Sequence, residues 1–441
     1  MQRTLRLVEH GEAEVVATRR DLALTRFAAS RIHQNVAEHD ATLRVRIVDG
    51  ERTGVASTNR LDESGLRDVV ARAAAIAERA RPNPNGAPIA EASEGLDSDL
   101  GYVAATAQAD PRQRADGAAT VIAAAQRSDL IASGAFSTEG RTIAVANSAG
   151  VHATHRSSEA RLVTVLMRDR ASGYAQAVGS DIGQIDAEAA GLEAADKAER
   201  SEGATDLEPG AYRVVLEAYA VGTLLEYLSL ISFGALALEE GRTFMEIGEP
   251  VMGDNVSIWD DGLDATGIPS VIDYEGVPKQ RVDLVRDGVA VGVVHDSATA
   301  RRAGVASTGH GLPAPNTWGP IAWNLHMAGG RAEATEDLLA GIERGVWVTR
   351  FHYVNIVHPK KGVLTGMTKD GTFLIENGRI TRPIHNLRFT QSIPEAFSLI
   401  EGATAATRLT MAEYTGIATR VPALRIGSFT FTGATSEESG E

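Results

Sequence analysis

The amino-acid sequence predicts an α+β protein: an N-terminal α/β domain with hairpin-helix repeats, and a C-terminal, mostly β domain that contains one long buried helix. Three observations lead to this prediction. In the first half, short alternating strands are followed by amphipathic helices. Beyond residue 256, short strand-like runs are separated by Gly, Pro, Asp and Asn, as in β structure. Between the two halves, residues 219–238 form an apolar run of helical length.

The first hairpin and its helix are predicted in the first eighty residues. Residues 42–49 (TLRVRIVD) alternate apolar and polar side chains, as a half-buried strand does. Gly50-Glu51-Arg52 provides a turn, and residues 53–58 return. Residues 64–80 then show helical spacing of their apolar side chains, and the sequence PNPNG stops the helix.

The same order of elements recurs later in the first half. Residues 162–168 predict a strand, residues 174–177 predict its return, and residues 186–200 predict a helix that ends in Ala-Glu-Arg, as the first helix does. Between the two copies, the sequence predicts a helix over 113–128 and a hairpin with strands 131–136 and 141–146. The recurrence indicates a weak internal duplication, and a chance match between two common motifs stays the alternative.

Residues 202–210 (EGATDLEPG) are acidic and rich in turn-forming residues, and they mark the predicted domain boundary. We predict an N-terminal domain over 1–205, a C-terminal domain over 206–432 and a disordered tail over 433–441. The predicted C-terminal elements are strands at 212–217, 283–286, 289–295, 346–357, 372–375 and 424–432, the helix at 219–238, and hairpin turns at Asp287-Gly288 and Asn377-Gly378.

Composition excludes several classes of function. The formal net charge is −15 and no basic run is longer than two residues, which argues against nucleic-acid binding. The chain has no cysteine, so disulfides, thiol nucleophiles and cysteine-ligated zinc are excluded, and a reducing cytoplasm is the expected location. The N-terminus has no apolar signal segment. Residues 219–238 are long enough to span a membrane, but the central Glu226 favours a buried helix of a soluble protein.

The centre of that predicted helix reads Leu225-Glu226-Tyr227-Leu228-Ser229-Leu230. A helical zinc-peptidase motif needs two imidazoles on one helix face, a carboxylate beside them as general base, and a third ligand from elsewhere. Glu226 has the position of such a base, but Leu225 and Leu230 cannot bind a metal. None of the eleven histidines is spaced to form another helical or strand pair of ligands. We therefore predict no metal site and no catalytic residue in this chain, and a structural role for Glu226.

Two stretches are candidates for contact with a substrate. In residues 348–353, alternation places Arg350 and His352 on one face and Phe351 and Tyr353 on the other. An Arg and a His together can hold a peptide carboxylate or carbonyl, although a strand with one polar face explains the pattern equally. The second stretch, residues 307–327, is a Gly- and Pro-rich loop that is long enough to line a peptide groove or form a dimer contact. The candidate substrate-binding residues are Arg350, His352, Tyr353, His310, Asn316 and Trp318.

Stretches of the chain resemble the TldD/PmbA (TldD/TldE) family, in the family's order. They are residues 25–35, 219–238, 273–286 and 345–383. In that family the TldD-type subunit carries His-Glu-x-x-x-His on this helix and a later cysteine, which together hold zinc. The family's glutamate falls on Glu226, its two histidines fall on Leu225 and Leu230, and the cysteine has no counterpart. The resemblance therefore implies a metallopeptidase-like C-terminal domain and a TldE/PmbA-type subunit that lacks the zinc-binding histidines.

The resemblance implies that this chain pairs with a TldD-type metallopeptidase that holds the zinc, in a complex that degrades or trims peptides. Our leading hypothesis is thus a non-catalytic subunit of a cytosolic heterodimer, with a peptide as substrate and neither nucleic acid nor membrane as partner. One alternative is a non-enzymatic, homodimeric module for peptide binding or assembly. Another is a repurposed, metal-free enzyme of peptide maturation.

Overall fold

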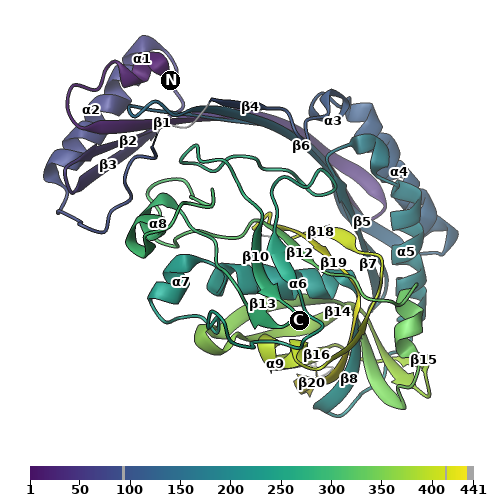
Figure 1. The fold of residues 1–441 in the computed structure, drawn as a ribbon. Coiled ribbons are helices and arrows are strands. Elements are labelled where there is room, and N and C mark those ends of the chain that lie inside the picture. The colour runs from purple at the N-terminus through teal and green to yellow at the C-terminus, as the bar shows by residue number, and fades with distance from the viewer. Residues whose placement is uncertain (92–94, 413–414, 435–441) are drawn as a thin grey trace.

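The structure is a computed structural model that describes residues 1–91, 95–412 and 415–434. A large N-terminal sheet arches over a C-terminal domain, which lies against its concave face (Figure 1). The predicted α+β class is confirmed, with helices and strands mixed in the first half and a mostly β second half. In the described ranges, no helix combines the length and the apolar character that crossing a bilayer requires.

The N-terminal sheet has the strand order β3-β2-β1-β5-β6-β4, and β7 also pairs with β6. All neighbours are antiparallel except β4 and β6. Its strands are β1 (Glu12–Ala28), β2 (Arg31–Asp49), β3 (Arg52–Thr58), β4 (Leu96–Ser98), β5 (Ile131–Asn147), β6 (His152–Arg168) and β7 (Ala171–Gly179).

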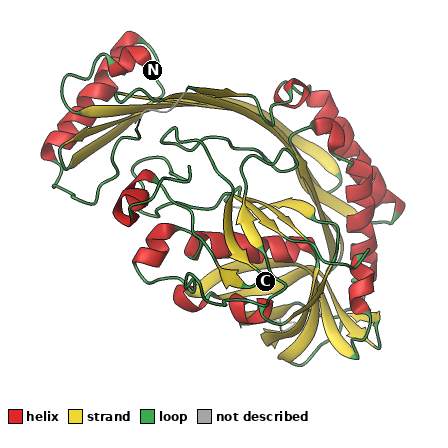
Figure 2. Ribbon diagram, in the orientation of Figure 1, coloured by secondary structure: helices red, strands yellow, loops and turns green. Residues whose placement is uncertain are grey.

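Helices cover the outer, convex face of this sheet in two groups, one at each end (Figure 2). One group is α1 (Gln2–Leu5) and α2 (Glu63–Arg79), and the other is α3 (Ala104–Ala107), α4 (Pro111–Arg127), η1 (Ile182–Gln184) and α5 (Ala187–Arg200). Each group packs over its own apolar core. Burial of these two separate cores against one continuous sheet stabilises the N-terminal half.

The two predicted hairpin-helix copies pack in the same way. In the first copy, a Cβ atom on Gly54 of β3 would lie 2.0 Å from the carbonyl oxygen of Ala73 in α2. In the second, a Cβ atom on Gly173 of β7 would lie 2.1 Å from the carbonyl oxygen of Ala194 in α5. Only glycine permits such a close approach between strand and helix. Both copies therefore place a helix directly on its own hairpin at a glycine.

The predicted hairpin within 131–146 is wrong, because these residues form the single strand β5. Glu139 and Gly140, the expected turn, are paired with Leu22 and Asp21 of β1 on one side. On the other side they pair with β6. A long partner strand on each side satisfies the backbone groups of β5 through the glycine, so the chain continues extended instead of turning.

The C-terminal domain contains a closed barrel. Its ring runs β13-β8-β20-β16-β14 and closes because β14 also pairs with β13, while β15 and β17 attach to β14 and β20. The strands are β8 (Gly210–Leu216), β13 (Arg344–His358), β14 (Val363–Glu376), β15 (Arg379–Pro383), β16 (Leu387–Ser392), β17 (Ile400–Ala403) and β20 (Leu424–Ala434). The predicted hairpin turn at Asn377-Gly378 joins β14 to β15.

A second sheet of this domain has the order β11-β10-β9-β12-β19-β18. Its strands are β9 (Ile258–Asp260), β10 (Val282–Arg286), β11 (Val289–Ala290), β12 (Asn324–Met327), β18 (Arg408–Met411) and β19 (Ala418–Val421). The domain's helices are α6 (Ala218–Ile231), α7 (Ala235–Glu239), α8 (Ser297–Ala303), α9 (Ile393–Phe397), η2 (Thr335–Leu339) and η3 (Pro359–Lys361). The predicted strand over 289–295 covers only β11, since residue 291 onward leaves the sheet.

The predicted helix over 219–238 is two helices. The first, α6, ends at Ile231, and α7 begins at Ala235 after a break that includes Gly234. Gly234 is extended, and its α-carbon lies so close to Pro320 that a Cβ atom would be 2.1 Å from the proline's carbonyl oxygen. Tertiary contact at this glycine thus overrides the apolar pattern. At the end of the chain, β20 continues through Ala434, and the rest of the predicted tail lies outside the described residues.

Candidate functional site

The helix α6 directs its three singled-out residues to different surroundings. Glu226 and Leu230 lie four positions apart and share one face, and Leu225 is about a quarter of a turn away from Glu226. Leu225 is fully buried in the apolar core of the C-terminal domain. Glu226 is 6% exposed, and Thr415 Oγ1 donates a hydrogen bond of 2.8 Å to its Oε1. Leu230 is half-buried and lines cavities.

A small cavity of about 60 Å³, here called the Glu226 pocket, lies beside this carboxylate. It unites three of the predicted substrate-binding residues, Arg350, His352 and Tyr353, with Glu226. Its walls come from β7 (Tyr174, Gln176), α6 (Tyr219, Gly222, Thr223, Glu226, Tyr227), β13 (Arg350, Phe351, His352, Tyr353, Val354), and the end of β18 with the residue after it (Thr410, Met411, Ala412). The site therefore joins an N-terminal strand to three elements of the C-terminal domain.

Arg350 is held in place from two sides. Its Nη2 atom lies 2.6 Å from Oδ2 of Asp370, whose side chain is 1% exposed. Its guanidinium also lies over the ring of Tyr174, 4.4 Å from the ring centroid. The carboxylate in turn accepts a hydrogen bond of 2.7 Å from Ser172 Oγ. Arg350 therefore lines the Glu226 pocket as a planar cation that is fixed from two sides.

The predicted placement of Tyr353 on the same face as Phe351 is wrong. The register of β13 against β14 shifts between His352 and Asn355, and Tyr353 has a φ of +49°. This bulge interrupts the alternation, so Phe351 is buried while Tyr353 is 71% exposed. The Tyr353 and His352 rings lie 4.4 Å apart, between centroids. Both aromatic rings line the pocket.

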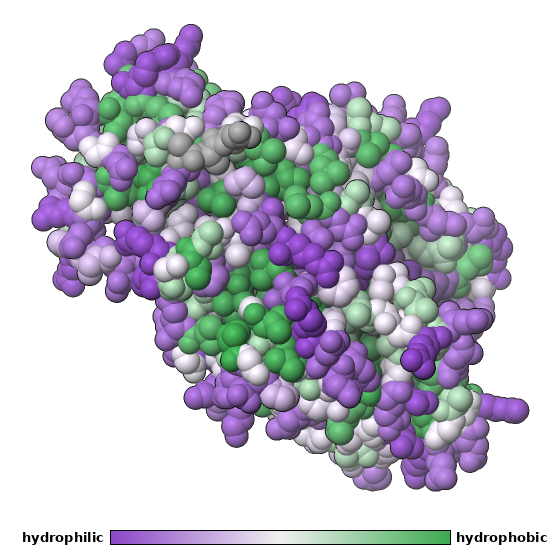
Figure 3. All heavy atoms as spheres, in the orientation of Figure 1, coloured by the Kyte–Doolittle hydropathy of each residue, from purple (hydrophilic) through white to green (hydrophobic). Residues whose placement is uncertain are grey.

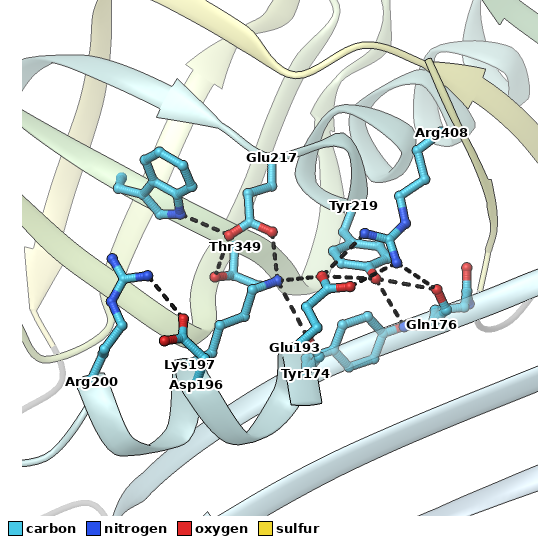
Figure 4. Close-up of polar contacts among 11 residues, drawn as sticks. Tyr174, Gln176, Glu193, Asp196, Lys197, Arg200, Glu217, Tyr219, Thr349 and Arg408 are labelled. Atoms are coloured by element: carbon cyan, nitrogen blue, oxygen red, sulfur yellow. Dashed lines mark hydrogen bonds and ion pairs between the residues drawn. The ribbon is translucent and has the colours of Figure 1, made fainter. Parts of the chain in front are cut away.

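A buried polar network forms the wall behind the pocket (Figure 4). Lys197 of α5 lies 2.6 Å from Glu217 and 2.7 Å from Glu193, between the two carboxylates. Burial alone would lower the pKa of Lys197, but the two carboxylates outweigh it and raise the pKa. Arg408 of β18 pairs with Glu193 and lies over the ring of Tyr219, which lines the pocket. The network joins the N-terminal helix α5 to the C-terminal domain.

A second and larger cavity, of about 600 Å³, lies between β5 and loops of the C-terminal domain. We call it the Trp318 cavity, and His310 and Trp318 both line it. His310 is buried, with Nε2 2.8 Å from Asp260 Oδ1 and Nδ1 2.9 Å from Thr308 Oγ1. Burial lowers its pKa, and the neighbouring cation of Lys279 adds to this. With both ring nitrogens bonded inside the protein, His310 supports the cavity wall.

Trp318 and Asn316 line different cavities. Trp318 is 62% exposed and presents its indole at the Trp318 cavity. Asn316 instead shapes the loop, because its side chain accepts from the backbone N–H of Trp318 and donates to the carbonyl of Gly319. It lines a different cavity, next to Pro315. The structure thus groups five of the six predicted residues around two neighbouring cavities and leaves Asn316 outside both.

The residues around Glu226 do not fit a zinc site. Across the described ranges, no three or more His, Asp or Glu side chains come together as a metal ion would require. The two helix positions beside Glu226 that would carry imidazoles carry aliphatic leucines, and one of them, Leu225, points into the core. Tetrahedral zinc needs at least three protein ligands with lone pairs. No chemical step through a metal can therefore be derived for these residues.

Sequence reasoning missed the residues that the N-terminal domain supplies. Tyr174 and Gln176 reach the Glu226 pocket from β7. The side-chain amide of Gln176 forms two hydrogen bonds with the backbone of Met411. Its nitrogen donates to the carbonyl of Met411, and its oxygen accepts from the N–H of Met411. Nothing in the sequence around residue 174 marks this role, since the strand was predicted there only as the return of a hairpin. Contacts between segments that are distant in the sequence place these two residues at the pocket.

Comparison with known proteins gives consistent matches. Residues 209–433 match the model of the PmbA/TldA metallopeptidase C-terminal domain, and residues 13–77 match that of PmbA/TldA metallopeptidase domain 1. The chain is 34% identical over 149 residues to a metalloprotease TldD homolog of Haemophilus influenzae. It is 30% identical over 186 residues to an uncharacterized protein of Methanocaldococcus jannaschii.

These alignments cover 32% and 41% of this chain, and 29% and 44% of the two relatives. The matched part thus spans less than half of either relative. Among solved structures, TldE from Thermococcus kodakarensis superposes with a TM-score of 0.86 at 18% identity, over 98% of both chains. At this identity the superposition shows a shared fold.

Proposed function

The chain belongs to the PmbA/TldA metallopeptidase family, and we propose that within this family it is a non-catalytic, TldE/PmbA-like subunit. Its partner would be a TldD-type metallopeptidase that supplies zinc and the general base, in a cytoplasmic complex that degrades or trims peptides. The name of the solved neighbour, TldE, is in keeping with this role, and the name of the Haemophilus relative with such a partner.

One observation carries the proposal. Leu225 occupies a ligand position of the family's motif, and its side chain is 0% exposed within the core. A histidine in this rotation of the helix would have to leave the core to reach a metal beside Glu226. Burial of a leucine there contributes roughly 1.5–3 kcal/mol to stability. The helix is therefore built for packing, and Glu226 for a hydrogen bond with Thr415.

The proposed contribution of this subunit is to hold the peptide. Arg350, fixed by Asp370 and Tyr174, would contact peptide carbonyl groups, and the exposed ring of Tyr353 would pack on a peptide side chain. His352 lies between them along β13 and lines the same pocket. Precise positioning of a substrate can raise the rate of a reaction whose chemistry takes place elsewhere.

Native mass spectrometry tests the proposal. The chain is purified alone, and after co-expression with a family member whose helix carries His-Glu-x-x-x-His. We expect a 1:1 complex with one zinc ion, and a metal-free chain without peptidase activity when it is alone. A matched partner with both histidines changed to alanine should still assemble but lose zinc and activity. Stoichiometric zinc binding and peptide cleavage by the chain alone would refute the proposal. A metal-free homodimer that forms no complex with the co-expressed family member would indicate a peptide-binding module.

A further inference from the structure

The Trp318 cavity has walls that suit a bulky apolar group. At about 600 Å³, its volume is within the range of about 300–1,000 Å³ that is typical of ligand sites. Apolar side chains come from both halves of the molecule, with Ile143 from β5, Ile272 and Leu230 from the C-terminal domain, and Trp318 and Trp323 from its long loop. In the view of Figure 3, hydrophobic residues are gathered where the N-terminal sheet meets the C-terminal domain. Such a concave, largely apolar surface favours an apolar ligand group.

Among the described residues, one cation lines this cavity without an ion pair. Arg141 projects from β5 and donates a hydrogen bond to the hydroxyl of Tyr274, and it makes no ion pair within the described part of the chain. The nearest acid along its own strand, Glu139, is taken by Arg20 at 2.8 Å. The cross-strand neighbour of Glu139 is Glu159, and burial followed by the charge of Glu139 raises the pKa of Glu159 to about 7. Glu159 is thus only partly charged at neutral pH.

The other cation of the cavity is already balanced. Lys279 is buried, and its Nζ lies 3.8 Å from Asp260 Oδ1 and 3.4 Å from Asn324 Oδ1. Asp273, the acid in the cavity wall, accepts hydrogen bonds from three backbone N–H groups: those of Glu275, Val277 and Gly311. Of the cations that line the cavity, Arg141 is therefore the one without an ion pair in the described residues, and its charge acts at longer range on the partly charged Glu159.

From this arrangement we infer that the Trp318 cavity binds the C-terminal residue of a peptide, with its bulky apolar side chain among the tryptophans and its carboxylate on Arg141. The inference rests on the proposed peptide role of this subunit and names the class of peptide that it takes. An arginine recognises a carboxylate through two parallel N–H···O bonds, and a half-buried setting strengthens them. The apolar walls then select the side chain next to that carboxylate.

Isothermal titration calorimetry on the full chain tests the inference. The probes are Ac-Gly-Ala-Gly-Gly-Phe as the free acid, the same peptide as the C-terminal amide, and the free acid that ends in Gly in place of Phe. We expect the phenylalanine acid to bind at least about tenfold more tightly than either of the others, because each of them lacks one of the two contacts. Arg141→Gln should bring the acid and the amide to equal affinity.

The matched control is Arg26→Gln, which changes an exposed arginine of β1 that has no place in the cavity and should leave all affinities unchanged. Trp318→Ala changes an exposed side chain, so the fold should be retained. It should lower the affinity for both phenylalanine peptides and leave the ratio of their two affinities unchanged. Equal binding of the acid and the amide by the unchanged chain, or of Phe and Gly peptides, overturns the inference. Failure of all three peptides to bind overturns it as well, whereas the proposed subunit role is judged separately by assembly with the zinc-bearing partner.

Discussion

Leu225 and Leu230 are the two residues that the resemblance aligns with zinc-binding histidines, and their surroundings in the structure differ. Leu225 is fully enclosed by the core of the C-terminal domain. Leu230 is half-buried and faces the Trp318 cavity. The contributions of these two side chains to stability should therefore differ, and this difference can be measured.

We predict that Leu225→Ala lowers the free energy of unfolding by about 2–5 kcal/mol, because it leaves a void in a close-packed core. Leu230→Ala, the matched control on the same helix, should cost about 1 kcal/mol, because a half-buried side chain loses less contact. Urea-induced unfolding of the two variants provides both values. Equal losses would mean that the two leucines share one environment, and the argument that α6 is built for packing at residue 225 would fail.

The surroundings of some single residues could be predicted from the sequence, and those of others could not. Sequence reasoning placed Arg350 and His352 on one face of a strand, because side chains two positions apart share a face, and both line the Glu226 pocket. It also pointed to His310, but the role of that side chain depends on Asp260, which lies fifty positions away and accepts its hydrogen bond. Arg141 carried no local signal, since its place in the Trp318 cavity, without an ion pair in the described residues, follows from the fold.

At the scale of elements, the sequence predicted the repeated order of hairpin and helix better than it predicted where individual strands end or bulge. The hairpin followed by a helix is present twice, and the glycines of β3 and β7 meet their helices in the same way. The run through Glu139-Gly140 has the composition of a turn, yet two long neighbours hold β5 straight. The bulge in β13 at Tyr353 could not be predicted either. A prediction from alternating side chains assumes that the strand pairs with its neighbour without a shift in register.

The close approach at Gly173 leads to a second prediction. We expect Gly173→Ala to destabilise the protein by about 3 kcal/mol, since its Cβ atom would lie 2.1 Å from the Ala194 carbonyl oxygen and α5 would have to move. The control is Gly179→Ala in the same strand, where a Cβ atom would meet only Gln184, at 3.9 Å. That change should stay within about 0.5 kcal/mol of the unchanged protein. Thermal unfolding followed by circular dichroism distinguishes the two, and similar melting temperatures would contradict the proposed packing of the repeat.

At the scale of the whole molecule, the candidate site depends on how the two halves meet. The Glu226 pocket takes Tyr174 and Gln176 from the N-terminal sheet, and the Trp318 cavity takes Arg141 and Ile143 from it. The sequence predicted the two halves but not which faces they turn toward each other. That arrangement follows from long-range pairs such as Lys197 with Glu217 and Arg408 with Glu193, which no local pattern shows.

The junction between the halves can be tested at Lys197. Its charge lies between Glu217 and Glu193, and Glu217 also accepts hydrogen bonds from Trp347 and Thr349 of β13. We predict that Lys197→Met lowers the free energy of unfolding by about 3–5 kcal/mol, because it leaves a buried carboxylate without its cation. Removing both charges, in Lys197→Met with Glu217→Gln, should recover part of the loss, since the neutral amide tolerates burial better than an unpaired carboxylate.

Arg200→Met is the matched control, because this cation belongs to the same helix but pairs with an exposed carboxylate. Arg200 and Asp196 are 3.0 Å apart, with side chains that are 40% and 63% exposed. Such a surface pair is worth about 1 kcal/mol or less. Urea titrations of the four proteins measure these differences. If Lys197→Met cost no more than Arg200→Met, the polar network would not be what fastens α5 to the C-terminal domain, and other contacts between the halves, such as Gln176 with Met411, would hold the walls of the cavities.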